Sequence, residues 1–221
     1  MNISKTFLIH IIKILLGIHS FSYRVAGFLS QKVEESGIHP KHRLMNYHKF
    51  FVDNVDKGDV VLDVGCGNGA LSYDVAKKAK KVVGIDLNEK NISFAKERYS
   101  EENIEYICGD ALKDLPNEKF DVIIMSNVLE HIENRVEFLE RLREKAARFL
   151  IRVPMINRDW ITLYKKEMGL DYRLDKGHFV EYTLDGFVKE LEKAGLRIQD
   201  YSIQFGEIWA VVTTDGSMEQ E

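Results

Sequence analysis

The sequence has 221 residues, 45% of them hydrophobic and 30% charged, a composition typical of a folded globular protein. Its formal net charge of −4 comes from mixed acidic and basic residues, so a strongly basic composition of the kind that binds nucleic acid is excluded. The two cysteines, Cys66 and Cys108, form no Cys-x-x-Cys pair, which argues against a zinc site or a disulfide framework and favours a cytoplasmic location.

The N-terminal segment predicts an amphipathic helix with a wide apolar face. Residues 7–18 are almost wholly apolar, and at about 100° per residue His10 and Lys13 fall on one narrow polar stripe. This apolar run is too short to cross a bilayer, and no small-residue cleavage site follows it. Because soluble monomers rarely expose such a face, we expect the helix to pack on its own domain or in a homodimer. Peripheral contact with a membrane, which would make the location membrane-proximal, is the alternative.

A second helix is expected at residues 44–54, after a polar stretch that begins at Gln31. Residues 1–54 are therefore interpreted as an N-terminal helical extension and cap, and residues 55–221 as the main domain. Three histidines of the cap have no carboxylate or cysteine at ligand spacing, so we interpret them as surface residues: His39, His42 and His48. No metal site is predicted.

From residue 60 onward, short apolar runs alternate with amphipathic segments. Strands are predicted at residues 60–64, 81–86, 104–107, 120–125 and 148–153, with helices at 70–79, 89–99 and 135–146. Apolar strands that alternate with helices are typical of a parallel sheet covered on both faces. The chain therefore belongs to the α/β class.

The C-terminal part departs from this alternation. A helix is predicted at residues 183–194, with Gly195 as its C-terminal cap, followed by strands at 196–204 and 208–214. The tight turn Phe205-Gly206-Glu207 between these strands forces an antiparallel pair, so the sheet is mixed. Residues 154–180 lack clear periodicity and are expected to form a loop or short helices.

A glycine-rich turn follows the first strand of the main domain. Residues 60–71 read V-V-L-D-V-G-C-G-N-G-A-L, which predicts a strand, a sharp turn that points its amides at a ligand, and a helix start. Gly65, Gly67 and Ala70 also fit the dinucleotide pattern G-x-G-x-x-A, and Asp86 lies 21 residues after Gly65. An acid at that spacing can bind the ribose hydroxyls of an adenine-containing ligand. An NAD-binding oxidoreductase is therefore one interpretation of the turn.

Three features favour a different ligand. Asp63 lies two residues before the first glycine, where a pyrophosphate gains nothing from an anion but a cationic amino-acid group does. Asp110, just past the third strand, is placed to accept a hydrogen bond from an adenine amino group. The hairpin at Phe205 interrupts the second half that a full dinucleotide-binding fold would build.

Four blocks resemble the motifs of class I S-adenosylmethionine-dependent methyltransferases. Residues 61–69 resemble motif I, residues 84–87 motif II, residues 109–111 the turn that contacts adenine, and residues 120–132 motif IV with its following segment. The blocks occur in family order within residues 44–214. The resemblance implies a Rossmann-like methyltransferase fold with a seven-stranded, mostly parallel sheet, one antiparallel strand and an N-terminal helical cap. It also implies S-adenosyl-L-methionine as the cofactor.

The resemblance implies a cofactor-binding set, within which Arg43 and the nearby Tyr47 would close over the methionine end. The set comprises Arg43, Asp63, Gly65, Cys66, Gly67, Gly69, Asp86, Leu87, Asp110, Ala111, Ser126 and Asn127. Two of its acids have structural alternatives, Asp86 as the N-cap of the helix that follows and Asp110 as a simple turn residue.

Methyl transfer is an in-line displacement in which the protein chiefly aligns the acceptor with the methyl group. A hydroxyl acceptor also needs a base, and His131 and His178 are the candidates. A structural role for Glu130 and His131 is an equal alternative. The expected acceptor is a small molecule, a sugar or a lipid-linked compound, since the Asn-Pro-Pro-Tyr-like signature of base methylation is absent and no nucleic acid is expected. A non-catalytic S-adenosylmethionine-binding protein is a third hypothesis.

Overall fold

The computed structural model describes residues 4–35 and 39–214. Two compact units are present, one formed by the chain up to Tyr47 together with Asp159–Arg173, the other by His48–Arg158 together with the chain from Leu174 onward. The predicted domain boundary at residue 54 stays a prediction.

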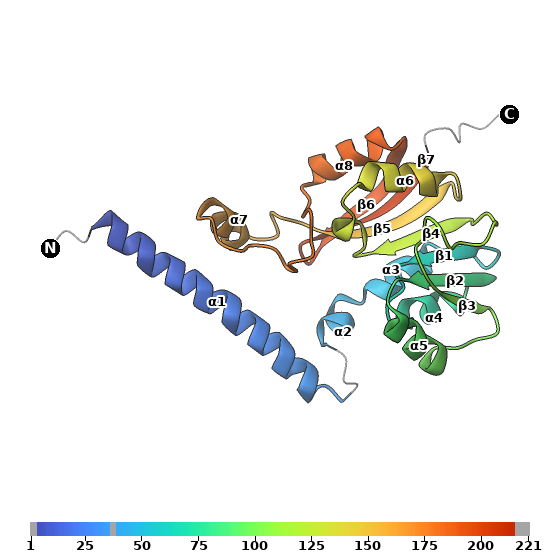
Figure 1. Ribbon diagram of the computed structural model, residues 1–221, viewed down its shortest axis with the longest axis horizontal. Coiled ribbons are helices and arrows are strands. Elements are labelled where there is room, and N and C mark those ends of the chain that lie inside the picture. The colour runs from blue at the N-terminus through green and yellow to red at the C-terminus, as the bar shows by residue number, and fades with distance from the viewer. Residues whose placement is uncertain (1–3, 36–38, 215–221) are drawn as a thin grey trace. The chain divides into compact units, whose positions relative to one another are not determined.

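The second unit is built on a single seven-stranded sheet with the strand order β3-β2-β1-β4-β5-β7-β6 (Figure 1). Its strands are β1 (Val60–Val64), β2 (Lys81–Asp86), β3 (Ile104–Cys108), β4 (Val122–Ser126), β5 (Arg148–Pro154), β6 (Leu196–Gln204) and β7 (Glu207–Thr214). Strands β1 to β5 pair in parallel, and β7 runs antiparallel between β5 and β6. The predicted mixed sheet with one antiparallel strand is confirmed.

Helices cover both faces of this sheet. They are α4 (Ala70–Ala76), α5 (Glu89–Arg98), α6 (Arg135–Arg143) and α8 (Leu184–Lys193), with a 3-10 helix η1 (Leu129–His131) after β4. Leu62 and Val64 of β1 share one buried core with apolar residues of α6 and α8. The alternate residue Asp63 points to the opposite face, where it contacts Ser72 of α4. Burial on both faces explains why the strands read as continuous apolar runs.

The predicted strands and helices of this unit are confirmed, with ends that differ by a few residues. Helix α4 ends at Ala76 rather than at residue 79, because the amides of Lys78 and Ala79 both turn back to the carbonyl of Val75. The hairpin between β6 and β7 turns through Phe205 and Gly206, whose φ angles are +52° and +74°. Two consecutive left-handed residues give a turn whose twist matches paired antiparallel strands.

The helix predicted at residues 44–54 is interrupted. Asn46 has a φ of +48°, and this left-handed residue ends α2 (Lys41–Met45) before α3 (Tyr47–Asp53) begins. The segment 154–180 contains one helix, α7 (Trp160–Glu167), whose N-cap Asp159 accepts a hydrogen bond from the amide of Thr162.

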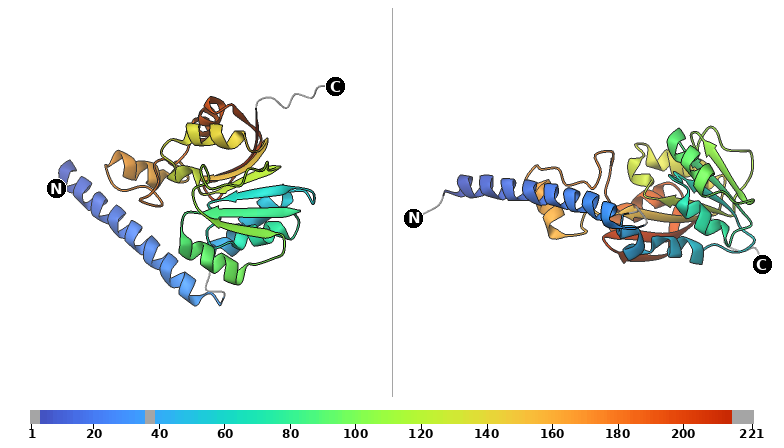
Figure 2. Two further views of the ribbon diagram at one scale, coloured as in Figure 1. Left: turned by 45° about the vertical axis from the view of Figure 1, so that its right-hand side comes forward. Right: turned by 90° about the horizontal axis from the view of Figure 1, so that it is seen from below.

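The first unit contains α1 (Lys5–Val33), a single helix of 29 residues that is drawn without a break in Figure 2. The prediction that the N-terminal apolar run is too short to cross a bilayer is corrected, because the helix continues through Phe21, Val25 and Phe28 and is long and apolar enough by length and composition. The expectation that its apolar face packs on the domain or in a homodimer stays a prediction. Leu16 is the buried residue of α1, while Ile14 is 62% and Phe21 64% exposed.

Candidate active site

The turn after β1 needs its glycines for geometric reasons. Gly65 and Gly69 have φ angles of +65° and +83°, and a Cβ on Gly65 would lie 2.6 Å from Val128 Cγ2. A Cβ on Gly69 would lie 2.7 Å from Ala95 Cβ. Gly67, with a φ of +55°, has no heavy atom within 4 Å of such a Cβ. The backbone at Gly67 therefore borders open space that a ligand can enter.

The amides of this turn donate within the protein. The N–H groups of Gly65 and Cys66 donate to the Ile85 carbonyl at 2.8 and 3.1 Å, and that of Gly67 donates to Asp86 Oδ2 at 2.9 Å. The prediction that the turn points these amides at a ligand is wrong, because their hydrogen atoms are already used by β2.

Asp63 is a buried acid in the middle of an otherwise apolar strand. Its side chain accepts a hydrogen bond of 2.6 Å from Ser72 Oγ and is only 1% exposed. Burial raises its pKa to about 7, the negative charge of Asp86 adds to this shift, and the bond from Ser72 opposes it. A cationic ligand group at this carboxyl would recover the cost of its ionisation, which supports the predicted role for Asp63.

Asp86 ends β2 and stabilises the two segments on either side of it. Its Oδ2 accepts from Gly67, and its Oδ1 accepts from the amide of Asn88 at 2.8 Å. The N-cap of α5 is Asn88, whose side chain accepts from the amide of Lys90, so the alternative in which Asp86 is the N-cap is wrong. A carboxylate has about four acceptor positions, and those that remain can serve a ribose. Leu87, the next residue, is 78% exposed.

Asp110 makes the side-chain hydrogen bonds of a turn residue. Its Oδ1 accepts from the amide of Leu112 at 2.8 Å, and its Oδ2 lies 2.9 Å from Lys113 Nζ. The hydrogen bond from Leu112, followed by that from Lys113, lowers the pKa of its carboxyl. Ala111 packs against the main core. Contact of Asp110 and Ala111 with adenine stays a prediction.

A buried ion pair lies beside the end of β4, and the sequence did not predict it. Arg152 of β5 pairs with Glu207 of β7 through Nε–Oε2 and Nη2–Oε1 distances of 2.5 and 3.0 Å, and its Nη1 donates to Ser126 Oγ at 3.1 Å. Asn127 follows with a φ of +57°, and its Oδ1 is buried without a hydrogen-bond partner in the described part of the chain. The available signal was an arginine inside the apolar strand sequence R-F-L-I-R-V-P.

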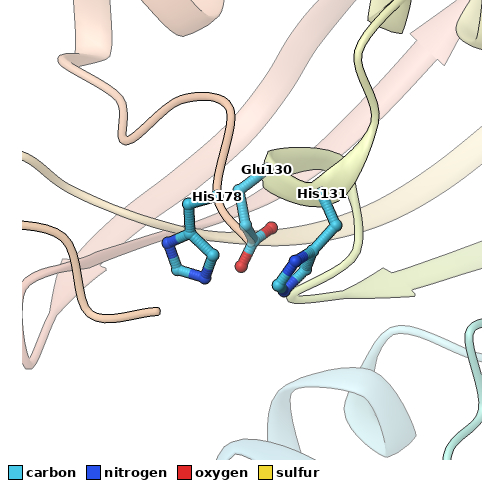
Figure 3. A group of neighbouring side chains, drawn as sticks. All are labelled: Glu130, His131 and His178. Carbon is cyan, nitrogen blue, oxygen red and sulfur yellow. The ribbon is translucent and has the colours of Figure 1, made fainter. Parts of the chain in front are cut away.

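Glu130, His131 and His178 meet beside this strand end. Glu130 and His131 lie in η1, His178 comes from the loop before α8, and the amide of Phe179 donates to the Glu130 carbonyl at 2.8 Å. The two imidazoles are edge to face with centroids 4.6 Å apart, and Figure 3 shows the Glu130 carboxylate between them. Potential ligand atoms of all three side chains lie within 4.8 Å of one another. The two histidines predicted as catalytic are thus neighbours.

Glu130 and His178 are buried, whereas His131 is exposed. Glu130 has 0% exposure, and burial raises its pKa to about 7. Within residues 4–35 and 39–214, both of its carboxylate oxygens are buried without a hydrogen-bond partner. Burial, together with the neighbouring His178, lowers the pKa of His131. Sequence reasoning predicted no metal-ligand set, because Glu130 and His178 are 48 positions apart and only the fold brings them together.

Two comparisons place this site among known proteins. A methyltransferase domain family matches residues 62–148. A protein of Methanococcus maripaludis, described as a probable cobalt-precorrin-6B C(15)-methyltransferase (decarboxylating), is 34% identical over 125 residues, which cover 55% of this chain and 67% of that protein. The chain belongs to the class I S-adenosylmethionine-dependent methyltransferases.

Other members of the family differ in length and named function. The ubiquinone biosynthesis O-methyltransferase of Bradyrhizobium diazoefficiens is 31% identical over 117 residues, or 52% of this chain, and the match spans about half of that protein, 46% of its length. The solved magnesium protoporphyrin IX methyltransferase of Synechocystis PCC 6803, with bound S-adenosylhomocysteine, has a TM-score of 0.58 at 23% identity over 79% of this chain and 82% of that one. This likeness confirms the fold. The cofactor of this methyltransferase is S-adenosylmethionine.

Arg43, the remaining predicted cofactor residue of this methyltransferase, lies in the first unit. Its guanidinium pairs with Glu34 at 2.8 Å and is 66% exposed. Tyr47 Oη bonds His42 Nδ1 at 2.8 Å. Their closure over the methionine end stays a prediction. Cys66 is buried, and burial raises the pKa of its thiol, as expected for a packing residue.

Proposed function

We propose that this methyltransferase transfers the methyl group of S-adenosylmethionine to a hydroxyl oxygen of a lipid-soluble small molecule at a membrane surface. The lipid-soluble acceptor class is inferred from one observation, that the apolar helix α1 exposes most of its large hydrophobic side chains. The relative named for O-methylation in ubiquinone biosynthesis supports oxygen as the acceptor atom.

The methyl donor is assigned to the carboxyl ends of β1 and β2. Asp63 offers a buried carboxyl to the ammonium group of the methionine portion, and Asp86 offers its remaining acceptor positions to the ribose. Open space at Gly67 leaves room for a ligand between them. The cofactor supplies a methyl group on a positively charged sulfur, so the protein needs to hold and align rather than to activate it.

The acceptor side is assigned to the segment after β4. A hydroxyl must lose its proton when its oxygen takes up the methyl group, so a proton acceptor or a bound cation is needed close to that oxygen. Glu130, His131 and His178 are the polar side chains that the fold gathers there. His131 is the exposed member of the three and therefore faces the side from which an acceptor can approach.

Helix α1 has the composition of a membrane-surface helix. At 1.5 Å per residue its 29 residues extend over about 44 Å. The helix contains no acidic residue, and its charged side chains are Lys5, Lys13, Arg24 and Lys32. A basic, apolar helix is attracted to anionic lipid and gains free energy by burying its apolar face in the lipid interface.

The experiment combines vesicle co-sedimentation with methyl transfer. We expect the full chain to sediment with vesicles that contain anionic lipid, and the double variant Ile14→Asp, Phe21→Asp to stay in solution. The variant Ser22→Asp, Gln31→Asp introduces the same charge at polar positions of α1 and should still sediment. Methyl-labelled S-adenosylmethionine and a total lipid extract should give label in the organic phase with the full chain.

Three results would contradict the proposal. Equal sedimentation of both double variants would remove the apolar face of α1 from membrane binding. Label that enters water-soluble acceptors alone would exclude a lipid-soluble acceptor, and cofactor binding without any transfer would indicate a non-catalytic binding protein.

A further inference from the structure

The burial of the Glu130 carboxylate is not explained by side-chain hydrogen bonds. Its side chain is fully buried, and neither carboxylate oxygen has a hydrogen-bond partner among the residues that the structure describes. An unpartnered buried carboxylate is costly, because it has lost its hydration without replacement. Two histidine rings lie within 4.8 Å of its oxygens, and all three side chains turn toward one another in Figure 3.

His178 is held in the orientation that a metal ligand requires. Its Nδ1 lies 3.2 Å from Glu181 Oε1, so this nitrogen donates to the carboxylate and Nε2 keeps its lone pair. Glu181 is fixed in turn by Arg158 and by the amide of Leu174, which donates to Oε1 at 2.6 Å. A carboxylate behind a ligating histidine is the usual outer-shell arrangement in metal sites.

We propose that Glu130, His131 and His178 bind one divalent cation of the Mn²⁺ to Zn²⁺ series, and that this cation binds the acceptor oxygen. Two imidazole nitrogens and one carboxylate form a set that these metals accept, whereas Ca²⁺ and Mg²⁺ prefer oxygen ligands throughout. Three protein ligands leave at least one position open for the acceptor. Binding of the acceptor oxygen by the cation rests on the proposed function, whereas the cation site itself rests on these side chains alone.

A cation at this position would account for the proton that a hydroxyl acceptor must lose. A hydroxyl bound to a divalent cation is more acidic and releases its proton to solvent. The oxygen lone pair then forms the bond to the methyl carbon, the carbon–sulfur bond breaks, and its electron pair stays on sulfur. The products are a methyl ether, adenosylhomocysteine and one proton, so atoms and charge balance.

The test is a titration of the untagged, metal-free full chain with Co²⁺, followed by visible absorption, and with Zn²⁺, followed by calorimetry. We expect one equivalent to bind, and Glu130→Gln and His178→Ala each to weaken the affinity at least about 100-fold. Glu181→Gln, which removes the outer carboxylate, should weaken it about 10-fold to 100-fold. His10→Ala removes an exposed histidine of α1 and should leave the affinity unchanged.

Adenosylhomocysteine binding by each variant shows whether it is folded, since none of these substitutions touches the turn at Gly67. If Glu130→Gln fails to fold, His131→Ala replaces it, because that side chain is exposed. The inference is overturned if no stoichiometric cation binds, or if the cluster variants bind it as well as the wild type does. Cation binding without methyl transfer would instead refute the proposed function and leave the metal site standing.

Discussion

Replacing Asp63 by Asn should make the ligand-free protein more stable above neutral pH and at the same time weaken its binding of adenosylhomocysteine. The carboxyl is only 1% exposed, and burial raises its pKa from 3.8 to about 7. An amide of the same shape still accepts the hydrogen bond from Ser72 but never ionises.

The magnitude follows from proton linkage. Between pH 4 and pH 7 the folded protein keeps a proton on Asp63 that the unfolded chain has released, so the stability conferred by this group is lost as pH rises through that window. A shift of about 3 pKa units at 1.36 kcal/mol each corresponds to about 4 kcal/mol, which is an upper limit for the gain of the Asn variant at pH 8. At pH 4 the two proteins should be almost equally stable.

Urea unfolding at pH 4, 5, 6, 7 and 8 measures this difference. Ser72→Ala is the matched control, because it removes the hydrogen bond that lowers the Asp63 pKa. In that variant the pH dependence should persist and extend to higher pH. A difference in unfolding free energy between wild type and Asp63→Asn that does not vary with pH would refute the reasoning.

Binding provides the second half of the prediction. With a pKa of about 7, roughly nine of ten Asp63 carboxyls are protonated at pH 6, so adenosylhomocysteine should bind about 10-fold more weakly at pH 6 than at pH 8. Asp63→Asn should bind weakly and without this pH dependence. Equal affinity of both proteins at pH 8 would remove Asp63 from the cofactor site.

Five further substitutions test the site and its support. Asp86→Ala should lower the free energy of unfolding by about 1–3 kcal/mol even without ligand, because the amides of Gly67 and Asn88 lose their acceptor, and unchanged urea unfolding would contradict this. Gly65→Ala should destabilise the fold more than Gly67→Ala does, because a Cβ at Gly65 would lie 2.6 Å from Val128 while one at Gly67 would have no heavy atom within 4 Å. Equal melting temperatures of the two variants would contradict this. Gly67→Ala should instead reduce adenosylhomocysteine binding, measured by calorimetry. Glu207→Gln leaves the buried Arg152 without its counter-charge and should cost about 3–5 kcal/mol in urea unfolding, whereas Asp185→Asn, in an exposed pair, should change nothing measurable.

The sheet could be predicted from sequence because its signals are local. Most strands from β1 to β5 are short apolar runs separated by helices, although β3 leads to β4 without one, and the turn at Phe205 leaves room for an antiparallel pair alone. Asn46 interrupts the predicted helix at 44–54 because its left-handed conformation depends on surroundings that a periodic pattern does not reveal.

The proximity of site residues follows from the sequence directly only where they share one motif. Asp63, Gly65 and Gly67 follow one another in the chain, so their proximity needs no knowledge of the fold. The contact of Glu130 with His178, and the pair of Arg152 with Glu207, join separate strands and loops. Their chemistry depends on burial, which sequence patterns assign to a strand or helix as a whole and not to single polar side chains.

The identity of the cofactor is the central claim about this protein. Isothermal titration calorimetry of the full chain with adenosylhomocysteine and, separately, with NAD measures it. We predict that one equivalent of adenosylhomocysteine binds and that NAD produces no binding heat, because the buried carboxyl of Asp63 suits a cationic amino-acid group and gains nothing from an anionic pyrophosphate. Saturable binding of NAD without binding of adenosylhomocysteine would contradict the account.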